Sequence, residues 1–254
     1  MLKEIILNRQ LFLVTLILAA PLITYCSLLN AESVAKPLTI KWLGQACLYI
    51  EAPDGTRIVT DPYSSGLPYA PPTIEAELVT ISHGHSDHNA PDRVKGAPVV
   101  INAIPTAPKT TGMVTVSGFP SFHDDAQGAK RGPNIIFMFT IGKYKIVHLG
   151  DLGDIPAPEV IQALKGADLV FAPVGEVYTM PVEQIVALTE TIQAKTVVPI
   201  HYSINKDKPL YGLLTIDKYL NALKPGTKVR NADQLTAESG FQNEVVVLAT
   251  WKPE

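Results

Sequence analysis

Short apolar runs recur along the chain between polar or turn-forming residues, which is the pattern typical of β-strands. Leu38–Trp42 alternates apolar and polar side chains, and Arg57–Thr60 follows a turn at residues 53–55. The predicted strands are Leu38–Trp42, Ala46–Glu51, Arg57–Thr60, Leu78–Ser82, Val99–Asn102, Val114–Ser117, Ile135–Ile141, Lys145–Leu149, Leu169–Ala172, Thr196–Ile200 and Glu244–Thr250.

Apolar residues at helical spacing predict three helices, all in the second half of the chain. These helices are Pro158–Leu164, Val182–Ile192 and Ile216–Leu223. Thr179 and Pro181 are start signals for the second helix, and Thr215 is a good N-cap for the third. Long runs of strands with helices appended favour a layered α/β domain. The length of 254 residues fits one such domain, over 32–254, better than two small ones.

The first 31 residues have a different pattern. Lys3 and Arg9 flank a polar start, and Leu11–Ala20 is apolar apart from one threonine. This pattern predicts a secretory signal peptide cut after Ala31, and therefore a periplasmic or secreted protein. An uncleaved membrane anchor is the alternative, because the apolar segment is nearly long enough to span a bilayer. Lipid attachment at Cys26 is a third possibility.

Charge and cysteine content exclude several classes. The formal net charge is −3 and no block of lysine or arginine is present, so the electrostatic footprint of a nucleic-acid binder is missing. Removal of the signal leaves Cys47 as the single cysteine, which rules out an intrachain disulfide. We expect a small-molecule substrate and membrane contact only through the N-terminal segment; the sequence leaves the oligomeric state open.

The most informative segment is residues 82–89, Ser-His-Gly-His-Ser-Asp-His-Asn. His83, His85, Asp87 and His88 supply four potential metal ligands within six residues, directly after an apolar strand. His83 and His85 are two apart, so in an extended segment both rings point the same way and can hold one ion. Asp87 and His88 follow where a helix can begin, which would turn them toward a second ion. Imidazole and carboxylate suit zinc, and also manganese or iron.

This H-x-H-x-D-H run resembles the signature of the metallo-β-lactamase superfamily. Residues 42–46 and 60–63 look like the opening hairpins of its broad metal-dependent hydrolase branch, which includes the ascorbate-phosphate lactonase type. The resemblance covers nearly all of the mature chain and implies a four-layer αββα sandwich. It also implies that His123 completes the first metal site, that Asp151 bridges both ions, and that His201 is the last ligand of the second.

The residues support these assignments independently of the resemblance. His123, Asp151 and His201 each lie at or just after the end of a predicted strand, where sites are commonly built in α/β folds. The sixth histidine, His148, is expected to be a core histidine or one that supports the ligands; a proton shuttle is the alternative. Asp61 resembles the family's buried aspartate that hydrogen-bonds the metal loop.

The chemistry implied is hydrolysis of an ester, lactone, amide or phosphodiester by a metal-bridging hydroxide, because two ions lower the pKa of a shared water and polarise the substrate oxygen. Asp87 and Asp151 are the expected catalytic residues, with Asp87 also taking the proton of the nucleophile. Tyr202 either donates to the developing oxyanion or packs in the core.

Three other functions compete with this interpretation. True metallo-β-lactamases lack the bridging aspartate and many use a cysteine ligand, whereas this chain has Asp151 and its Cys47 lies in an early strand. Nuclease relatives carry a large inserted domain for which the chain has no room. A non-catalytic protein that captures or senses metal with the same ligands is the main alternative.

Loops are expected to form the pocket walls at residues 62–72, 119–133, 175–181 and 203–211. The tyrosines in or beside these loops suggest an aromatic lining: Tyr63, Tyr69, Tyr178 and Tyr211. Arg131 is either a contact for an anionic substrate group or a surface residue. Asp124 and Asp125 either steady His123 or lie in a solvated loop, and Glu176 is a further pocket candidate.

Overall fold

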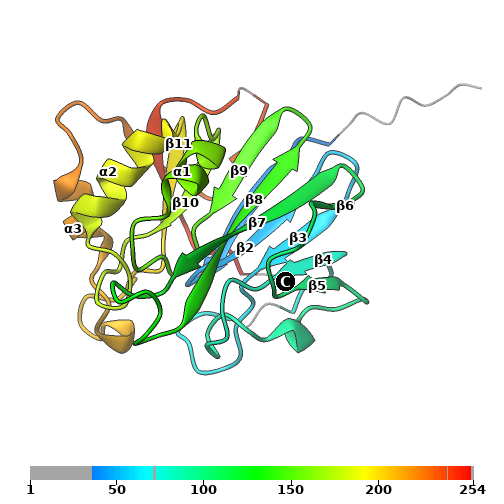
Figure 1. Cartoon of the computed structure of the whole chain (residues 1–254), viewed down its shortest axis with the longest axis horizontal. Helices are drawn as coiled ribbons and strands as arrows, with labels where there is room; N and C mark the ends of the chain where they lie inside the picture. Colours follow the sequence, from blue (N-terminus) through cyan, green and yellow to red (C-terminus); the bar gives the residue numbers. More distant parts are fainter. Residues whose placement is uncertain (1–35, 71–72, 239, 253–254) are drawn as a thin grey trace, which may run out of the picture. The chain divides into compact units, whose positions relative to one another are not determined.

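The computed structural model describes residues 36–70, 73–238 and 240–252. The predicted signal peptide or anchor over residues 1–31, with Cys26, lies outside the described residues. Within the described ranges no helix is both long enough and apolar enough to cross a membrane. The chain from Ala35 onward forms one unit, and it is built around two β-sheets (Figure 1).

The first sheet is formed by the first five strands and the late strand β13, in the order β13-β1-β2-β3-β4-β5. Strands β1 to β3 pair antiparallel, whereas β3, β4 and β5 run parallel. Its strands are β1 (Thr39–Gly44), β2 (Cys47–Glu51), β3 (Arg57–Thr60), β4 (Leu78–Thr80), β5 (Val99–Ile101) and β13 (Leu235–Thr236).

The second sheet contains eight strands in the order β12-β14-β11-β10-β9-β8-β7-β6. Strands β6 to β9 form an antiparallel meander, and β9, β10, β11, β14 and β12 run parallel. Its strands are β6 (Lys109–Thr111), β7 (Val114–Phe122), β8 (Pro133–Ile141), β9 (Tyr144–His148), β10 (Leu169–Pro173), β11 (Thr196–Ile200), β12 (Val229–Ala232) and β14 (Glu244–Leu248).

The main core lies between the two sheets, where Trp42 and Leu48 from the first belong to one buried cluster with Phe137 and Phe139 from the second. The same cluster continues under the helices, which lie together on the left of Figure 1: α1 (Pro158–Leu164), α2 (Val182–Ile192) and α3 (Ile216–Ala222). These layers confirm the predicted α/β fold.

A second, smaller core cluster covers the other face of the first sheet. It contains Cys47, Tyr63 and Tyr69, all buried. Loop segments form this outer layer, together with the short 3-10 helix η1 (Pro91–Arg93). The arrangement places the two early tyrosines in the core, so the prediction that they line a pocket is wrong.

The predicted elements match the structure best where they are buried. Helices α1 and α2 and strand β11 have the predicted bounds. Strands β6, β12 and β13 were not predicted, because they are short edge segments, two of them largely exposed, with little apolar patterning. Thr215 precedes α3 as expected, but its hydroxyl donates to Asp217 at 2.9 Å instead of capping the helix.

Candidate metal centre

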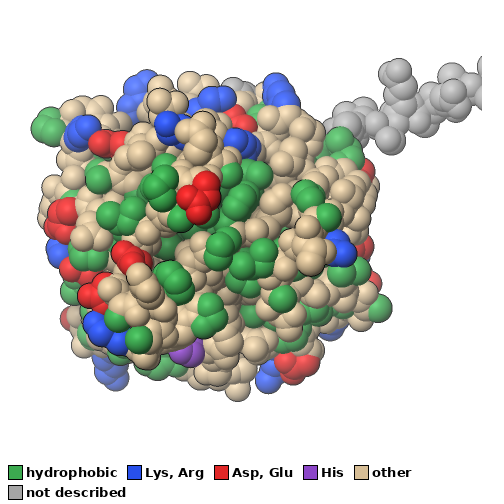
Figure 2. All heavy atoms as spheres, viewed as in Figure 1, with side chains coloured by type: hydrophobic (Ala, Val, Ile, Leu, Met, Phe, Trp, Pro, Cys, Tyr) green, Lys and Arg blue, Asp and Glu red, His purple; other side chains and the backbone are tan. Residues whose placement is uncertain are grey.

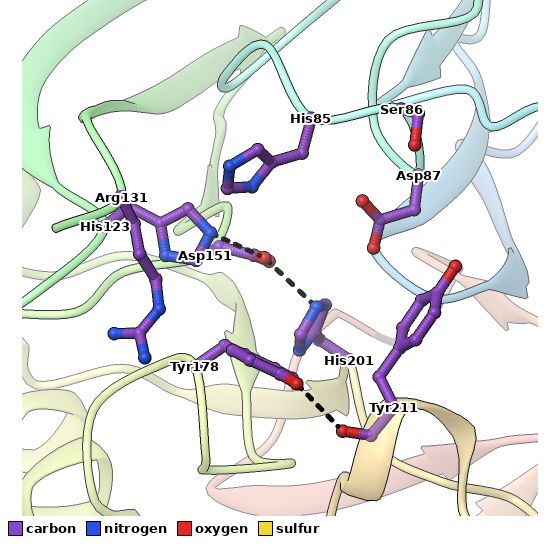
Figure 3. A pocket seen from close by; sticks show the side chains of 9 residues that line it. All are labelled: His85, Ser86, Asp87, His123, Arg131, Asp151, Tyr178, His201 and Tyr211. Atoms are coloured by element: carbon purple, nitrogen blue, oxygen red, sulfur yellow. Dashed lines mark hydrogen bonds and ion pairs between the residues drawn. The ribbon is translucent and has the colours of Figure 1, made fainter.

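The predicted ligands come from four strand ends that meet on one side of the molecule. The metal loop, residues 82–88, follows β4; His123 follows β7; Asp151 lies three residues after β9; and His201 directly follows β11. Figure 3 shows side chains from these segments pointing toward one another around Asp151. Four separate stretches of sequence are therefore brought together, as predicted.

The metal loop is a series of bends and a turn, in which the His88 N–H donates to the His85 carbonyl at 3.0 Å. The expected extended segment at His83–His85 and the expected helix start at Asp87 are therefore wrong. The rings nevertheless converge, because His83 Nε2 lies 3.0 Å from His85 Nδ1. Bends shorten the loop enough to bring all four of its potential ligands to one place.

One carboxylate oxygen lies at the centre of the cluster. Asp151 is 2% exposed, and four histidine Nε2 atoms surround its Oδ2 at 3.0 Å (His201), 3.2 Å (His88), 3.4 Å (His123) and 3.8 Å (His83). Burial alone would raise the pKa of Asp151, but His201 and His88 hold it well below its ordinary value. The carboxylate is therefore a buried anion ringed by imidazoles.

Two triads of potential ligands flank this carboxylate. His83, His85 and His123 form one, and Asp87, His88 and His201 form the other; within each, the candidate ligand atoms all lie within 4.8 Å of one another. The six side chains supply five imidazoles and one carboxylate, the donor types that zinc and related divalent ions prefer.

Buried polar atoms without partners support a fit to metal. Asp151 Oδ1 and His88 Nε2 make no hydrogen bond with any described residue, although His88 Nε2 lies near Asp151 Oδ2 without hydrogen-bond alignment. Unpaired buried polar atoms are costly and rare, so they call for an ion or water. Burial and nearby His88 lower the pKa of His83 to about 3, which leaves it neutral as a ligand must be.

Asp61 orients the metal loop from beneath. Its carboxylate accepts the Ser82 N–H at 2.7 Å and the Ser82 hydroxyl at 2.6 Å, and it lies 3.0 Å from His88 Nδ1. Burial would raise the pKa of Asp61, but His88 and His148 lower it, so the group is an ionised acceptor. The proton of His88 must then lie on Nδ1. The predicted hydrogen bonding of Asp61 to the loop is confirmed.

Ser82 transmits the same constraint to His83. Because the Ser82 hydroxyl donates to Asp61, its oxygen accepts from His83 Nδ1 at 3.0 Å. His83 Nε2 is therefore left with a free lone pair that faces Asp151. His88 Nε2 also faces Asp151, but Asp151, Asp61 and Asp87 raise the pKa of His88 despite its burial, so a bound metal would displace the proton from this nitrogen. This is the arrangement in which a partner on one ring nitrogen prepares the other nitrogen for metal binding.

His148 is a buried core residue, as the first of its two interpretations predicted. Its Nε2 donates to the Ala46 carbonyl at 2.8 Å, and its Nδ1 accepts the Gly150 N–H at 3.3 Å. Burial lowers the pKa of His148, which keeps the ring neutral. Both nitrogens are engaged with backbone, so the ring ties β9 to the first sheet and has no free atom for proton shuttling.

Two supporting residues were missed from the sequence. Gln45 is fully buried, and its Nε2 donates to Asp87 Oδ2 at 2.9 Å. Asn134 on β8 accepts the Asp151 N–H at 3.0 Å and donates to the Leu149 carbonyl at 2.9 Å. The polar character of Gln45 within an apolar hairpin was a usable signal, whereas nothing in the sequence near Asn134 indicates its partner.

The ligands open into a cavity of about 490 Å³. Its lining is His85, Ser86, Asp87, His123, Arg131, Asp151, Tyr178, His201 and Tyr211 (Figure 3). The Tyr178 hydroxyl donates to the Tyr211 carbonyl at 3.1 Å, which joins two of the predicted wall loops. The predicted aromatic lining is confirmed for this pair, and Arg131 borders the pocket.

Other residues that were candidates for the site lie outside the pocket. Tyr202 is 4% exposed and stacks on Trp42 with ring centroids 5.1 Å apart, so the oxyanion-donor interpretation is wrong and the packing interpretation is confirmed. Within the predicted wall loop 62–72, the described residues 62–70 do not line the pocket. Glu176 pairs with Lys218 on α3 at 2.5 Å and does not line the pocket.

Asp124 and Asp125 have different roles. The buried Asp124 carboxylate accepts backbone N–H bonds from four residues of the loop that follows His123, namely Ala126, Gly128, Lys130 and Arg131. Desolvation opposes ionisation of Asp124, but these four donors lower its pKa below the ordinary value. Asp125 is exposed and pairs with Lys130. Asp124 therefore shapes the loop beside His123, and Asp125 is solvated.

The two sheets, the strand-end cluster and the central carboxylate define the class of protein. Residues 39–201, more than half of the chain, match the family described as the beta-lactamase superfamily domain. The chain belongs to this superfamily. The predicted membership is confirmed, and with it the predicted class of metal-dependent hydrolase at the level of the family.

Individual relatives agree with this placement. A UPF0173 metal-dependent hydrolase of Methanosarcina barkeri is 28% identical over 192 residues, which cover 65% of this chain and 83% of the relative. A UPF0173 metal-dependent hydrolase of Pyrococcus abyssi is 28% identical, and the match covers 75% of this chain and 98% of the relative. A crystal structure from Thermotoga maritima, described as a candidate zinc-dependent hydrolase of the metallo-β-lactamase superfamily, is 30% identical with a TM-score of 0.67 over 83% of this chain and 98% of that one.

Proposed function

We propose that the protein is an exported hydrolase with two divalent metal ions, zinc being the best fit, that cleaves an ester, lactone, amide or phosphodiester bond of a small substrate. His83, His85 and His123 would hold the first ion, and Asp87, His88 and His201 the second. Asp151 would lie between them as the shared ligand. The observation that carries the proposal is the pair of triads on either side of one buried carboxylate.

The chemistry of the ions is general. Divalent ions in such a site lower the pKa of a coordinated water and polarise a carbonyl or phosphoryl oxygen. The protein's part is to hold the geometry and the protons. Asp61 and Ser82 hold protons on the Nδ1 atoms of His88 and His83, so the Nε2 atoms are the ones aimed at the site.

Asp87 is the proposed proton acceptor. It faces the cavity, and His88 lowers the pKa of its carboxyl against the opposing effect of desolvation, so it is ionised at neutral pH. Gln45 fixes its Oδ2, which leaves the other oxygen to accept a proton from the attacking nucleophile. The pocket volume suits a small molecule, and its single arginine is not a nucleic-acid footprint.

Metal analysis and turnover test the proposal together. Purified protein is expected to contain about two ions per chain, and His201→Ala about one, because the first triad does not include His201. Wild type should hydrolyse chromogenic esters or phosphodiesters and lose activity with chelator. His85→Ala and Asp151→Ala should be inactive, whereas the exposed Asp125→Ala serves as a matched carboxylate control with wild-type activity.

The non-catalytic alternative gives a different result. A protein that binds two ions tightly and turns over none of a broad panel of esters, lactones, amides and phosphodiesters would be a metal-binding or sensing protein. A protein that stays metal-free when offered zinc or manganese would contradict both. Export is tested separately, by N-terminal sequencing of protein recovered from the periplasm or medium, with cleavage expected after Ala31.

A further inference from the structure

A second cavity of about 720 Å³ adjoins the candidate metal centre. It is a groove between the loop that follows β5 and the adjoining ends of β7 and β8, and the metal loop forms one end. Most of its surface is apolar, from Ala103, Ile104, Pro120, Phe122, Pro133 and Ile135. His85 and Arg131 line both this groove and the cavity at the metal centre, so the two cavities adjoin at these side chains.

Exposed apolar side chains alone do not mark a binding site. Figure 2 shows many hydrophobic side chains at the surface of the face drawn there, which is usual for proteins. The groove differs because its exposed members, Ile104 at 44% and Phe122 at 39%, line a hollow that ends at a potential ligand. Its volume lies within the range of small-molecule sites, about 300–1,000 Å³.

The groove wall is held in place by close packing. A Cβ at Gly118 of β7 would meet Pro105 Cδ at 2.9 Å and Ile135 Cγ2 at 3.2 Å, so only glycine lets the β5 loop lie this close to the sheet. The same Cβ would lie 3.6 Å from the Cα of Ile104, so the loop after β5 packs against β7 at this point. The cavity is therefore part of the folded sheet and not a gap beneath a free loop.

Arg131 supplies a charge where the two cavities meet. Its backbone N–H donates to Asp124 at 2.6 Å, which fixes the start of the side chain. Its guanidinium lies 5.4 Å from the Tyr178 ring centroid, and among the described residues it has no ion pair and no side-chain hydrogen bond. A cation without a carboxylate partner beside an apolar groove is suited to a ligand that carries both an anion and a hydrocarbon chain.

We propose that the groove binds the medium-length acyl chain of an anionic substrate and that Arg131 pairs with the anionic group. This inference rests on the proposed hydrolase function and specifies its substrate class as an acyl ester or amide. Hydrolysis breaks the acyl C–O or C–N bond: water supplies hydroxide to the acyl carbon and a proton to the leaving oxygen or nitrogen. The scissile bond would lie at His85, where the groove meets the metal centre.

Binding of simple carboxylates tests the groove without turnover. Titration calorimetry of metal-loaded protein should show octanoate binding about 10- to 100-fold more tightly than butyrate, because each fully buried methylene contributes about fourfold and the groove is partly open. Octan-1-ol, which lacks the anion, should bind about tenfold more weakly than octanoate. Equal affinities for butyrate and octanoate would overturn the proposal.

Variants separate the two parts of the site. Ile104→Ser should reduce the preference for octanoate over butyrate, whereas Ile155→Ser, an isoleucine exposed outside the groove, should keep it. Arg131→Gln should weaken the binding of octanoate about tenfold and leave the binding of octan-1-ol unchanged. Unchanged octanoate binding in Arg131→Gln would overturn the pairing of Arg131 with the anionic group.

Turnover then distinguishes this inference from the proposed function. With 4-nitrophenyl esters from acetate to decanoate, kcat/KM should rise by about two- to fourfold per methylene and then level off. Hydrolysis without chain-length preference, together with no octanoate binding, overturns the groove and leaves the hydrolase function intact. Octanoate binding without hydrolysis of any ester, lactone, amide or phosphodiester supports the groove and overturns the proposed function.

Discussion

Replacing Asp61 by asparagine tests how the metal loop is prepared for its ions. The aspartate accepts all three hydrogens that point at it, from Ser82 N, Ser82 Oγ and His88 Nδ1. Asparagine has nearly the same shape, but one of its two terminal atoms is a donor. If the amide oxygen keeps the Ser82 N–H, the NH₂ group faces the Ser82 hydroxyl and His88.

The expected consequence is a reversal of the proton arrangement. His88 must then accept at Nδ1 and carry its proton on Nε2, the atom 3.2 Å from Asp151 Oδ2 that should bind the metal. Loss of a partner that orients a ligand costs about 10- to 100-fold in metal affinity. That range equals about 1.4–2.7 kcal/mol. For a chain of this size, the rise in Tm caused by saturating zinc should shrink by about 3–11 °C.

The assay is thermal unfolding with and without zinc, combined with zinc calorimetry. Asp61→Asn should lose affinity mainly at the second site, while its metal-free Tm falls less than its metal-loaded Tm. Asp125→Asn, the same substitution at an exposed carboxylate, should match wild type. Wild-type zinc affinity and stoichiometry in Asp61→Asn would refute the argument that Asp61 sets the tautomer.

Four further predictions follow from single contacts. Gln45→Ala should lower metal-dependent kcat/KM about 10- to 100-fold with the fold retained, because Asp87 loses its positioning donor. Gln184→Ala, on the exposed face of α2, is the control, and unchanged kinetics in Gln45→Ala would contradict the assignment. Gly150→Ala should lower the free energy of unfolding, measured in urea, by at least about 2 kcal/mol, because φ is +58° and a Cβ would lie 2.7 Å from Ser82 Cβ. Wild-type stability of the variant would show that the turn can relax. Asp124→Ala should be less stable than wild type at neutral pH, where the Asp124 carboxylate is ionised. The difference in stability should vanish as pH falls through the lowered pKa of Asp124, below the ordinary value of about 4. A difference that persists in acid would contradict the argument that folding lowers this pKa. Tyr202→Phe should keep kcat within about twofold, since the ring stacks on Trp42 away from the pocket, and a loss of 100-fold or more would restore the oxyanion role.

Residue types along the chain were enough to identify the candidate metal site, and the structure explains why. Four potential ligands in the metal loop are local in sequence, so no tertiary information is needed to see them. The resemblance to the superfamily implied His123, Asp151 and His201, and their positions after strands supported them, because strand ends meet at one edge. Buried helices and strands were predicted closely for the same reason: burial imposes an apolar period on the sequence.

Exposed edges and polar contacts over long sequence distances were not predictable in this way. Strand β12 pairs only with β14 and is mostly exposed, so nothing selects apolar residues along it. Asn134 and Asp151 lie 17 residues apart and meet because β8 pairs with β9, a register that the sequence does not reveal. A polar side chain buried by such pairing looks like any exposed one in the sequence.

The tyrosines show most clearly which features the sequence determines and which only the tertiary structure decides. A tyrosine has an apolar ring and a polar tip, so its pattern along the chain is the same in a core as in a pocket wall. Tyr63 is buried with its hydroxyl donating to the Leu43 carbonyl, whereas Tyr178 and Tyr211 face the cavity. The sequence by itself determined which side chains can bind metal and which segments are buried. Only the tertiary structure decided which faces meet, because packing of two sheets joins residues that no local pattern relates.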